Sequence, residues 1–168
     1  YVQIDRQHPT GVVNVKVDGD GVAQYQFAHA VAWDFLEWNP DWQQLALDAD
    51  AVCFGSLAQR SEKSCGTIRQ FLASAPEHTL KVFDVNLRQS YYSDDILSES
   101  IRLADVVKLN DDELPKLMEV LNMSEKDDKA SARRLIRDFG LKVVCITRGS
   151  HGSLLVAGED VSEHPGFR

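Results

Sequence analysis

The sequence predicts an α/β protein: a mostly parallel sheet, doubly wound by helices, with a small β-hairpin attached to it. Two observations predict this class. From about residue 48, short apolar runs alternate with segments whose apolar residues recur every three or four positions, as in strand–helix–strand units. Before that point, Val13, Val15 and Val17 alternate with polar residues, as in a half-buried strand. We therefore expect a hairpin and connecting segment over residues 1–47 and an α/β part over residues 48–168.

The individual elements follow from local patterns. Asp-Gly-Asp-Gly at residues 18–21 predicts the hairpin turn, and residues 22–27 alternate again. Three tryptophans near Pro40 indicate a loop and a short helix. The predicted strands then cover residues 51–57, 81–85, 105–109, 142–146 and 153–157, and the predicted helices cover residues 61–75, 96–104, 111–121 and 130–139. The run 51–57 is apolar throughout, as in a buried parallel strand, so we expect helices on both faces of the sheet.

Composition excludes some classes of function. Lys and Arg number 18 and Asp and Glu 26, which gives a net charge of −8 and argues against a nucleic-acid surface. We find neither a membrane-spanning apolar run nor a secretory signal, so we expect a cytoplasmic protein. Three cysteines without a Cys-x-x-Cys pair are expected to be buried, reduced thiols. Tyr1 stands in place of an initiating Met, so we expect the natural N-terminus to lie outside this sequence.

Polar residues follow the predicted strand 81–85. Asp84 lies just inside it, and Asn86 and Arg88 come directly after. In doubly wound sheets, ligands bind beyond the carboxyl ends of the strands. Arg88 therefore suits a bound anion or a developing phosphoryl charge, although it also fits an ordinary surface side chain.

A second polar group follows the strand 105–109. Asn110 and Glu113 have the spacing of a capping box, and Asp111 and Asp112 suit a helix N-terminus. The same carboxylates could face a phosphate across a Mg²⁺ ion bound through waters. The two interpretations are compatible.

A third group is the Thr-x-Gly-x-x-Gly segment formed by Thr147, Gly149 and Gly152 after the strand 142–146. Two glycines let a backbone approach a phosphate closely, and the threonine hydroxyl can donate to it. A plain glycine turn between two strands explains the same residues. The segment does not match the P-loop pattern, and the five histidines have no metal-ligand spacing.

Taken in order, these segments resemble the PfkB (ribokinase-like) family of carbohydrate kinases, and its fructokinase-like members in particular. The matching segments are His-Pro-Thr-Gly at 8–11 with the following hairpin, Phe-Asp-Val-Asn-Leu-Arg at 83–88, the Asn-x-x-Glu motif within 105–113, and the Thr-x-Gly-x-x-Gly motif within 146–152. Each motif is moderately specific, and their common order is strong evidence.

The resemblance implies a role for each residue, with ATP and Mg²⁺ as cofactors and a sugar as the substrate. The sugar and the transferring phosphoryl group would lie near Asp84, Asn86 and Arg88, with Arg88 catalytic. The nucleotide would contact Lys108, Asn110, Thr147, Gly149 and Gly152, and Glu113 would hold Mg²⁺ through water. The hairpin would form a lid over the sugar and pair subunits into a homodimer.

The sequence also departs from the family pattern. The family's N-terminal segment, with a sugar-binding acidic residue and a Gly-Gly motif, has no match here. Its second signature, Asp-Thr-x-Gly-Ala-Gly-Asp, is also missing, and the last Asp of that signature is the family's general base. We therefore expect the N- and C-terminal parts of the fold to be absent and the 168-residue chain to be inactive alone.

The leading hypothesis is ATP-dependent phosphorylation of a sugar hydroxyl, most simply fructose or a related sugar, by the complete protein. One alternative is a non-catalytic, truncated kinase-like module that binds a nucleotide or a sugar. Another keeps the kinase but changes the acceptor to a nucleoside or a keto-acid sugar, which Arg88 would also suit.

Overall fold

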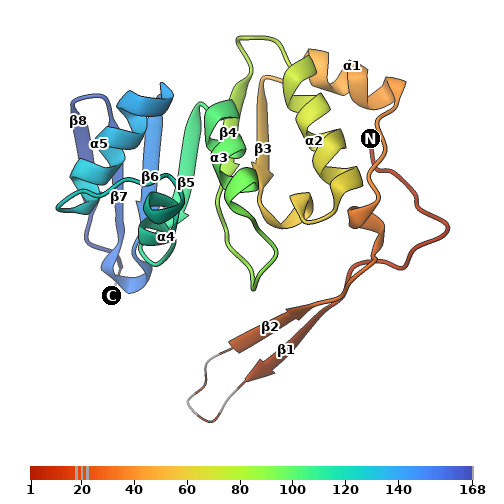
Figure 1. The fold of residues 1–168 in the computed structure, drawn as a ribbon, viewed down its shortest axis with the longest axis horizontal. Coiled ribbons are helices and arrows are strands. Elements are labelled where there is room, and N and C mark those ends of the chain that lie inside the picture. Colours follow the sequence, from red (N-terminus) through yellow and green to blue (C-terminus); the bar gives the residue numbers. More distant parts are fainter. Residues whose placement is uncertain (18, 20, 22, 168) are drawn as a thin grey trace.

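A computed structural model of the chain describes residues 1–167 except 18, 20 and 22. Within these residues it has a six-stranded sheet, in the order β3-β4-β5-β6-β7-β8, and a separate two-stranded hairpin (Figure 1). Strands β3 to β6 are parallel, and β7 and β8 are antiparallel to their neighbours. The predicted fold class is confirmed. The predicted turn at 18–21 and strand start at 22 rest partly on positions 18, 20 and 22, which lie outside the described residues.

The elements agree with the prediction to within a few residues. The strands are β1 (Val13–Val17), β2 (Ala23–Phe27), β3 (Ala51–Gly55), β4 (Leu80–Asp84), β5 (Val106–Asn110), β6 (Val143–Thr147), β7 (Ser153–Ala157) and β8 (Asp160–His164). The α-helices are α1 (Pro40–Asp48), α2 (Glu62–Ser74), α3 (Asp94–Leu103), α4 (Glu113–Val120) and α5 (Asp128–Phe139). Short 3₁₀-helices are η1 (Ala32–Asp34), η2 (Leu57–Gln59) and η3 (Gly149–His151).

Short polar side chains start most of the helices. Those of Asn39, Ser61, Ser93 and Asp127 each accept a hydrogen bond from the amide three residues further on. Gly140 ends α5 with φ of 69°, the left-handed C-cap that the sequence predicts. No helix in the described part of the chain combines the length and apolar character needed to span a bilayer.

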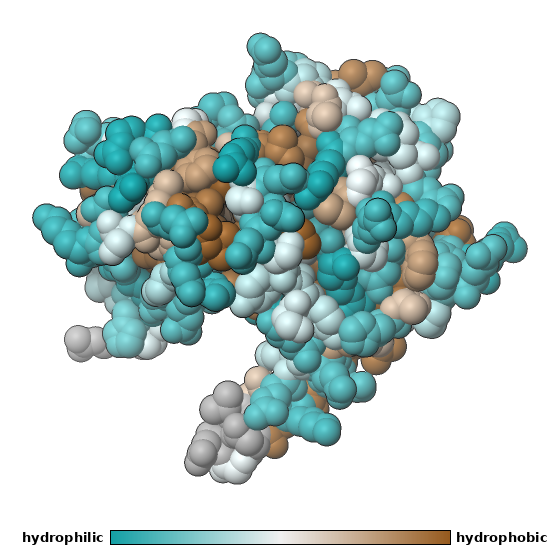
Figure 2. All heavy atoms as spheres, viewed as in Figure 1, coloured by the Kyte–Doolittle hydropathy of each residue, from teal (hydrophilic) through white to brown (hydrophobic). Residues whose placement is uncertain are grey.

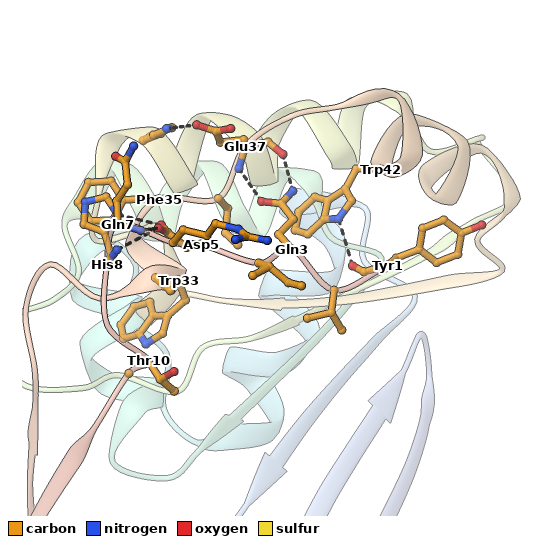
Figure 3. A pocket seen from close by; sticks show the side chains of 17 residues that line it. Tyr1, Gln3, Asp5, Gln7, His8, Thr10, Trp33, Phe35, Glu37 and Trp42 are labelled. Carbon is orange, nitrogen blue, oxygen red and sulfur yellow. Dashed lines mark hydrogen bonds and ion pairs between the residues drawn. The ribbon is translucent and has the colours of Figure 1, made fainter.

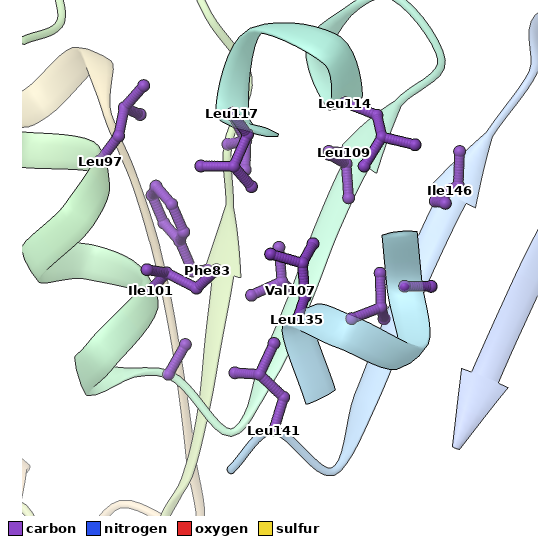
Figure 4. Packing of buried hydrophobic residues seen from close by; sticks show 14 of the residues in the cluster. Phe83, Leu97, Ile101, Val107, Leu109, Leu114, Leu117, Leu135, Leu141 and Ile146 are labelled. Carbon is purple, nitrogen blue, oxygen red and sulfur yellow. The ribbon is translucent and has the colours of Figure 1, made fainter. Parts of the chain in front are cut away.

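The core lies on one face of the sheet. Phe83, Val107 and Val144 are neighbours across β4, β5 and β6, and each is 0% exposed. Buried side chains of α3, α4 and α5 lie over these strands (Figure 4), while hydrophilic residues cover much of the face of the molecule that Figure 2 shows. Residues that alternate with the core positions, such as Val106 and Val143, are half-buried. We predicted helical cover on both faces, but the described helices α2 to α5 all contribute to this one core.

The prediction of a fully buried first strand is wrong. β3 is an edge strand with β4 as its neighbour, and Ala51 and Cys53 are exposed. The expected burial of the cysteines therefore holds for Cys65, is partial for Cys145 and fails for Cys53, and all three are free thiols. An edge position explains the exposure because one side of the strand lacks a neighbour.

The hairpin projects away from the sheet (Figure 1). β1 pairs with β2 in antiparallel register, with Val15 opposite Tyr25, as the alternation predicts. Every residue of β1 is nevertheless exposed, so the expected half-burial of this strand is wrong within the chain. The apolar side of the hairpin faces solvent rather than a core.

Strand β8 is missing from the sequence-based prediction. It pairs antiparallel with β7, with Val161 opposite Val156. Its residues are all exposed and mostly polar, so it lacks the apolar run on which strand prediction depends.

Candidate active site

The parallel register brings the predicted site residues to one edge of the sheet. Asp84 at the end of β4 pairs with Lys108 on β5, and Asn110 at the end of β5 pairs with Thr147 on β6. The carboxyl ends of β4, β5 and β6 therefore meet, as the strand–helix order predicts. Lys108 Nζ lies 3.1 Å from Asp84 Oδ1, and both side chains are about one-third exposed. The ion pair therefore joins Asp84, which we expect near the sugar, to Lys108, which we expect to contact the nucleotide.

The loop after β4 has an unusual backbone. Asn86 and Gln89 both have positive φ, at 41° and 49°, a left-handed conformation that non-glycine residues rarely adopt. Such strain persists where surrounding contacts fix it and is frequent at functional sites. Arg88 is half-buried, and its Nη1 donates to the Leu87 carbonyl oxygen at 3.2 Å.

The side chain of Glu113 anchors this loop through a hydrogen bond. Its Oε1 accepts from the Leu87 amide at 2.7 Å, and its Oε2 accepts from the Asn110 amide at 2.9 Å. The side chain is only 5% exposed. One buried carboxylate therefore ties the loop after β4 to the end of β5.

The reciprocal hydrogen bonds that the capping-box interpretation predicts are present, but the N-cap residue of the helix is Asp112 rather than Asn110. The Glu113 amide donates to Asn110 Oδ1 at 2.8 Å, which completes a reciprocal pair of hydrogen bonds. Helix α4 begins at Glu113, two residues later than predicted. The cap leaves Asp111 and Asp112 exposed at the helix start.

A preformed metal cage is not present among the described residues. They contain no cluster of three or more His, Cys, Asp or Glu side chains suited to hold a metal ion. The oxygens of Glu113 and Asn110 already accept backbone N–H groups, so direct coordination would compete with these bonds. Water-mediated contact fits better, because each oxygen keeps lone-pair capacity and Mg²⁺ usually retains several waters.

The turn after β6 contains two glycines in different surroundings, one tightly packed and one with free space beside it. Gly149 and Gly152 have positive φ, at 53° and 89°. A Cβ on Gly152 would overlap the His164 carbonyl oxygen at the end of β8, so packing alone requires glycine there. A Cβ on Gly149 would meet no atom within 4 Å, which leaves space beside that backbone. Thr147 Oγ1 donates to the Leu109 carbonyl oxygen at 3.4 Å.

A sizeable cavity lies elsewhere in the described part of the chain. It has a volume of about 650 Å³ and lies between the N-terminal segment and the stretch from η1 to α1 (Figure 3). Hydrogen bonds from the Gln7 amide and from His8 lower the pKa of Asp5 to about 2, and the His8 ring stacks on Phe35 at 3.5 Å. None of the predicted site residues lines this cavity. The predicted site is instead the open surface at the strand ends.

Sequence reasoning missed the residues that follow β3. Ser56 Oγ donates to the Val85 carbonyl oxygen at 2.7 Å and so supports the neighbouring strand end. Arg60, four residues further on, forms a buried ion pair with Asp34. The sequence could have revealed them by their position, because polar residues follow this strand just as they follow the three strands that we considered.

Comparison with known proteins agrees with this arrangement. Residues 1–168 match the family model described as pfkB family carbohydrate kinase. A curated relative, an uncharacterized sugar kinase from Pyrococcus horikoshii, is 26% identical over 178 residues, covering 97% of this chain and 50% of the relative. The chain spans about half the length of this relative.

Solved structures show the same fold. The Pyrococcus horikoshii protein in complex with ATP gives a TM-score of 0.75 at 25% identity, covering 98% of this chain and 51% of that one. A fructokinase from Xylella fastidiosa gives 0.76 at 20% identity, with 97% and 51% covered. A Vibrio cholerae fructokinase with bound fructose, ADP and calcium gives 0.74 at 21% identity, with 96% and 52% covered.

The α/β fold with its mostly parallel sheet matches that of ribokinase-like kinases. The chain belongs to the pfkB family of carbohydrate kinases, which confirms the family that its four motifs predict.

Proposed function

We propose that the complete protein carrying this chain uses ATP to phosphorylate a hydroxyl group of fructose or a related sugar. The observation that carries the proposal is the Glu113 carboxylate, which joins the Leu87 amide to the Asn110 amide. Because of this contact, the loop assigned to the sugar and the residues assigned to the nucleotide belong to one continuous site. The ATP complex of the Pyrococcus horikoshii relative and the fructose and ADP in the Vibrio cholerae neighbour support the same two ligands.

Each predicted residue has a role in this proposal. Asp84, Asn86 and Arg88 contact the sugar and the transferring phosphoryl group, where the Arg88 guanidinium offsets developing negative charge. The nucleotide-binding residues are Lys108, Asn110, Thr147, Gly149 and Gly152. Gly149 has open space beside its backbone, which suits the close approach of a phosphate.

Mg²⁺ bound with ATP would neutralise phosphate charge, and Glu113 and Asn110 would hold it through its waters. We assign the general base to no residue of this sequence. A polypeptide of these 168 residues alone is therefore expected to be inactive.

Dimerisation through the lid hairpin (β1 and β2) is part of the proposal. The register puts Val13, Val15 and Val17 on the same side as Phe27, Tyr25 and Ala23. Val15 and Tyr25 are each 52% exposed, so this apolar side has no cover within the described chain. A second copy of the same hairpin would bury it. The proposed substrates, ATP and a free sugar, favour a cytoplasmic enzyme.

The experiment is a substrate panel with the complete protein, Mg·ATP and fructose, other sugars, nucleosides and keto-acid sugars. Release of ADP that depends on fructose or a related sugar supports the proposal. Turnover with only a nucleoside or a keto-acid sugar would move the acceptor to that class. ATP binding without turnover on any acceptor would favour the non-catalytic module.

A further inference from the structure

Arg60 is a buried cation that joins separate segments of the chain. Its side chain and that of Asp34 are each 6% exposed. Arg60 Nε lies 2.8 Å from Asp34 Oδ1, and Nη2 lies 2.7 Å from Oδ2, which is a two-point fork. Nη2 also donates to the carbonyl oxygen of Ala28, directly after the lid hairpin.

Two aromatic rings lie against the Arg60 guanidinium. The Trp33 ring centroid lies 4.1 Å from Arg60 Cζ, and that of Tyr91 lies 4.6 Å away. Gly11 packs so closely on the Trp33 indole that a Cβ there would overlap it. A planar guanidinium can stack on these rings while it forms the two-point fork to Asp34, and a lysine ammonium cannot form that fork. We refer to Trp33, Asp34, Arg60 and Tyr91 together as the Arg60 clamp.

Tyr91 carries the connection from the clamp to the candidate active site. Its hydroxyl lies 2.8 Å from His29 Nε2 and donates to the Phe27 carbonyl oxygen at 3.4 Å, both at the base of the lid hairpin. Its amide donates to the Arg88 carbonyl oxygen at 3.0 Å. The clamp therefore connects the hairpin base, the η1 turn and the loop that carries Asn86 and Arg88.

Stability alone explains this cluster poorly. Taking an ion pair out of water costs about as much as the pair gains, so replacing it by apolar residues is often neutral or favourable. Within the described residues, Arg60 Nη1 is buried without a hydrogen-bond partner, which adds a further cost. The directional contacts instead favour a single arrangement of the segments that they join.

We propose that Arg60 is a positioning residue that holds the base of the lid hairpin and the Arg88 loop in one relative placement. Its effect on catalysis rests on the proposed function, in which the Arg88 loop contacts the sugar and the hairpin is the lid over it. The clamp keeps the hairpin base and the loop in this placement before the sugar binds. Arg60 itself is assigned no contact with substrate.

The first test is hydrogen–deuterium exchange on the complete, ligand-free protein. Arg60→Lys keeps the charge but loses the fork and the stacking, so exchange should accelerate by about tenfold in both residues 27–34 and residues 86–91. A similar increase in the exchange rate of both segments indicates that they open together in one event. Exchange in β6 and β7 should stay unchanged. The matched control is Arg69→Lys on α2, whose partner Glu99 lies on α3 outside both segments.

Tyr91→Phe is the milder variant, in case Arg60→Lys does not fold. It keeps the ring over Arg60 and removes only the hydroxyl contacts to the hairpin base. Exchange should again accelerate in both segments. Acceleration in one segment only, or in neither, overturns the proposal.

The second test is steady-state kinetics with the sugar found in the substrate panel. Both variants should raise the KM for the sugar by about tenfold and leave the KM for ATP within about twofold, because a misplaced lid affects the sugar side. Equal increases in both constants would indicate a merely structural role and contradict the proposal. If no sugar is phosphorylated, the proposed function fails, whereas the exchange experiment still decides whether the clamp couples the two segments.

Discussion

At the scale of the single residue, the Glu113 carboxylate holds the candidate site together by accepting hydrogen bonds from two backbone amides. Glu113→Gln offers one acceptor where the carboxylate offers two, and its amide group would face an amide N–H of Leu87 or Asn110. We expect the free energy of unfolding to fall by about 1–3 kcal/mol. Urea unfolding measures this loss, with Glu119→Gln, an exposed position on the same helix, as the control. Equal stability of the two variants would contradict the account.

Arg88 is the residue to which we assign the charge stabilisation in the proposed reaction. If its charge offsets negative charge in the transition state rather than in the ground state, Arg88→Ala in the complete protein should lower kcat by about a hundredfold or more. ATP binding should weaken far less. Steady-state kinetics and a nucleotide titration measure the two effects. Arg102→Ala, an exposed arginine on α3, should leave both unchanged, and an Arg88→Ala enzyme with wild-type kcat would refute the assignment.

Asp34 gives the Arg60 clamp a defined pH dependence. Burial raises the pKa of Asp34, but hydrogen bonds from Arg60 and the Val31 amide outweigh it, and the nearby His29 charge adds to them, so the pKa lies below the ordinary 3.8. The ionised form is therefore favoured in the folded state. Its stabilisation is fully present above pH 3.8 and is lost as the pH falls through the lower folded-state pKa.

Chemical unfolding of the wild type and Asp34→Asn at a series of acid pH values tests this sign. The wild type should lose stability more steeply than the variant as the pH falls below 3.8. Other carboxylates titrate in both proteins, so the difference between the curves isolates Asp34. Parallel curves would show that the pair contributes no pH dependence.

At the scale of the element, apolar periodicity predicted most strands and helices, because α2, α3 and α5 each bury one stripe in the core. β8 escaped prediction since its pairing with β7 uses backbone groups and exposed side chains. The period-2 pattern of β1 was read correctly, but the same pattern arises whether the apolar side meets a core or a partner subunit. Exposure of that side could therefore not be predicted from the sequence.

The hairpin provides the prediction at this scale. Val15→Asp puts a charge on the apolar side of β1, and burying an unpaired charge is costly, so the proposed dimer should dissociate at concentrations at least about tenfold higher than for the wild type. Lys16→Asp changes the opposite side of the same strand and serves as the control. Sedimentation analysis of the complete protein gives both dissociation constants. An undisturbed dimer in Val15→Asp would show that the hairpin is not the interface.

At the scale of the whole molecule, the sequence predicted which strand ends meet, because strand–helix–strand order determines that the carboxyl ends share one edge. It could not predict the Lys108–Asp84 pair or the Leu87–Glu113 bond, since these depend on register between strands distant in sequence. The Arg60 clamp was missed for the same reason, with Asp34 and Tyr91 on either side of it along the chain. The roles of the site residues and the division at residue 47 stay predictions.

A polypeptide of only these 168 residues provides a further test. β3 is an unpaired edge within the described residues, and the sheet face opposite the core is half-exposed. We expect this polypeptide to self-associate and to release no ADP in response to sugar. Light scattering and a coupled ADP assay measure these properties. Sugar-dependent ADP release by this polypeptide would contradict the assignment of the general base outside it.

Transfer of labelled γ-phosphate from ATP to fructose, measured side by side for the complete wild-type protein and Arg88→Ala, tests the central claim most directly. The account predicts a labelled sugar phosphate with the wild type and a loss of about a hundredfold or more in the variant. Absence of label on fructose and on every related sugar, with ATP bound normally, would contradict it.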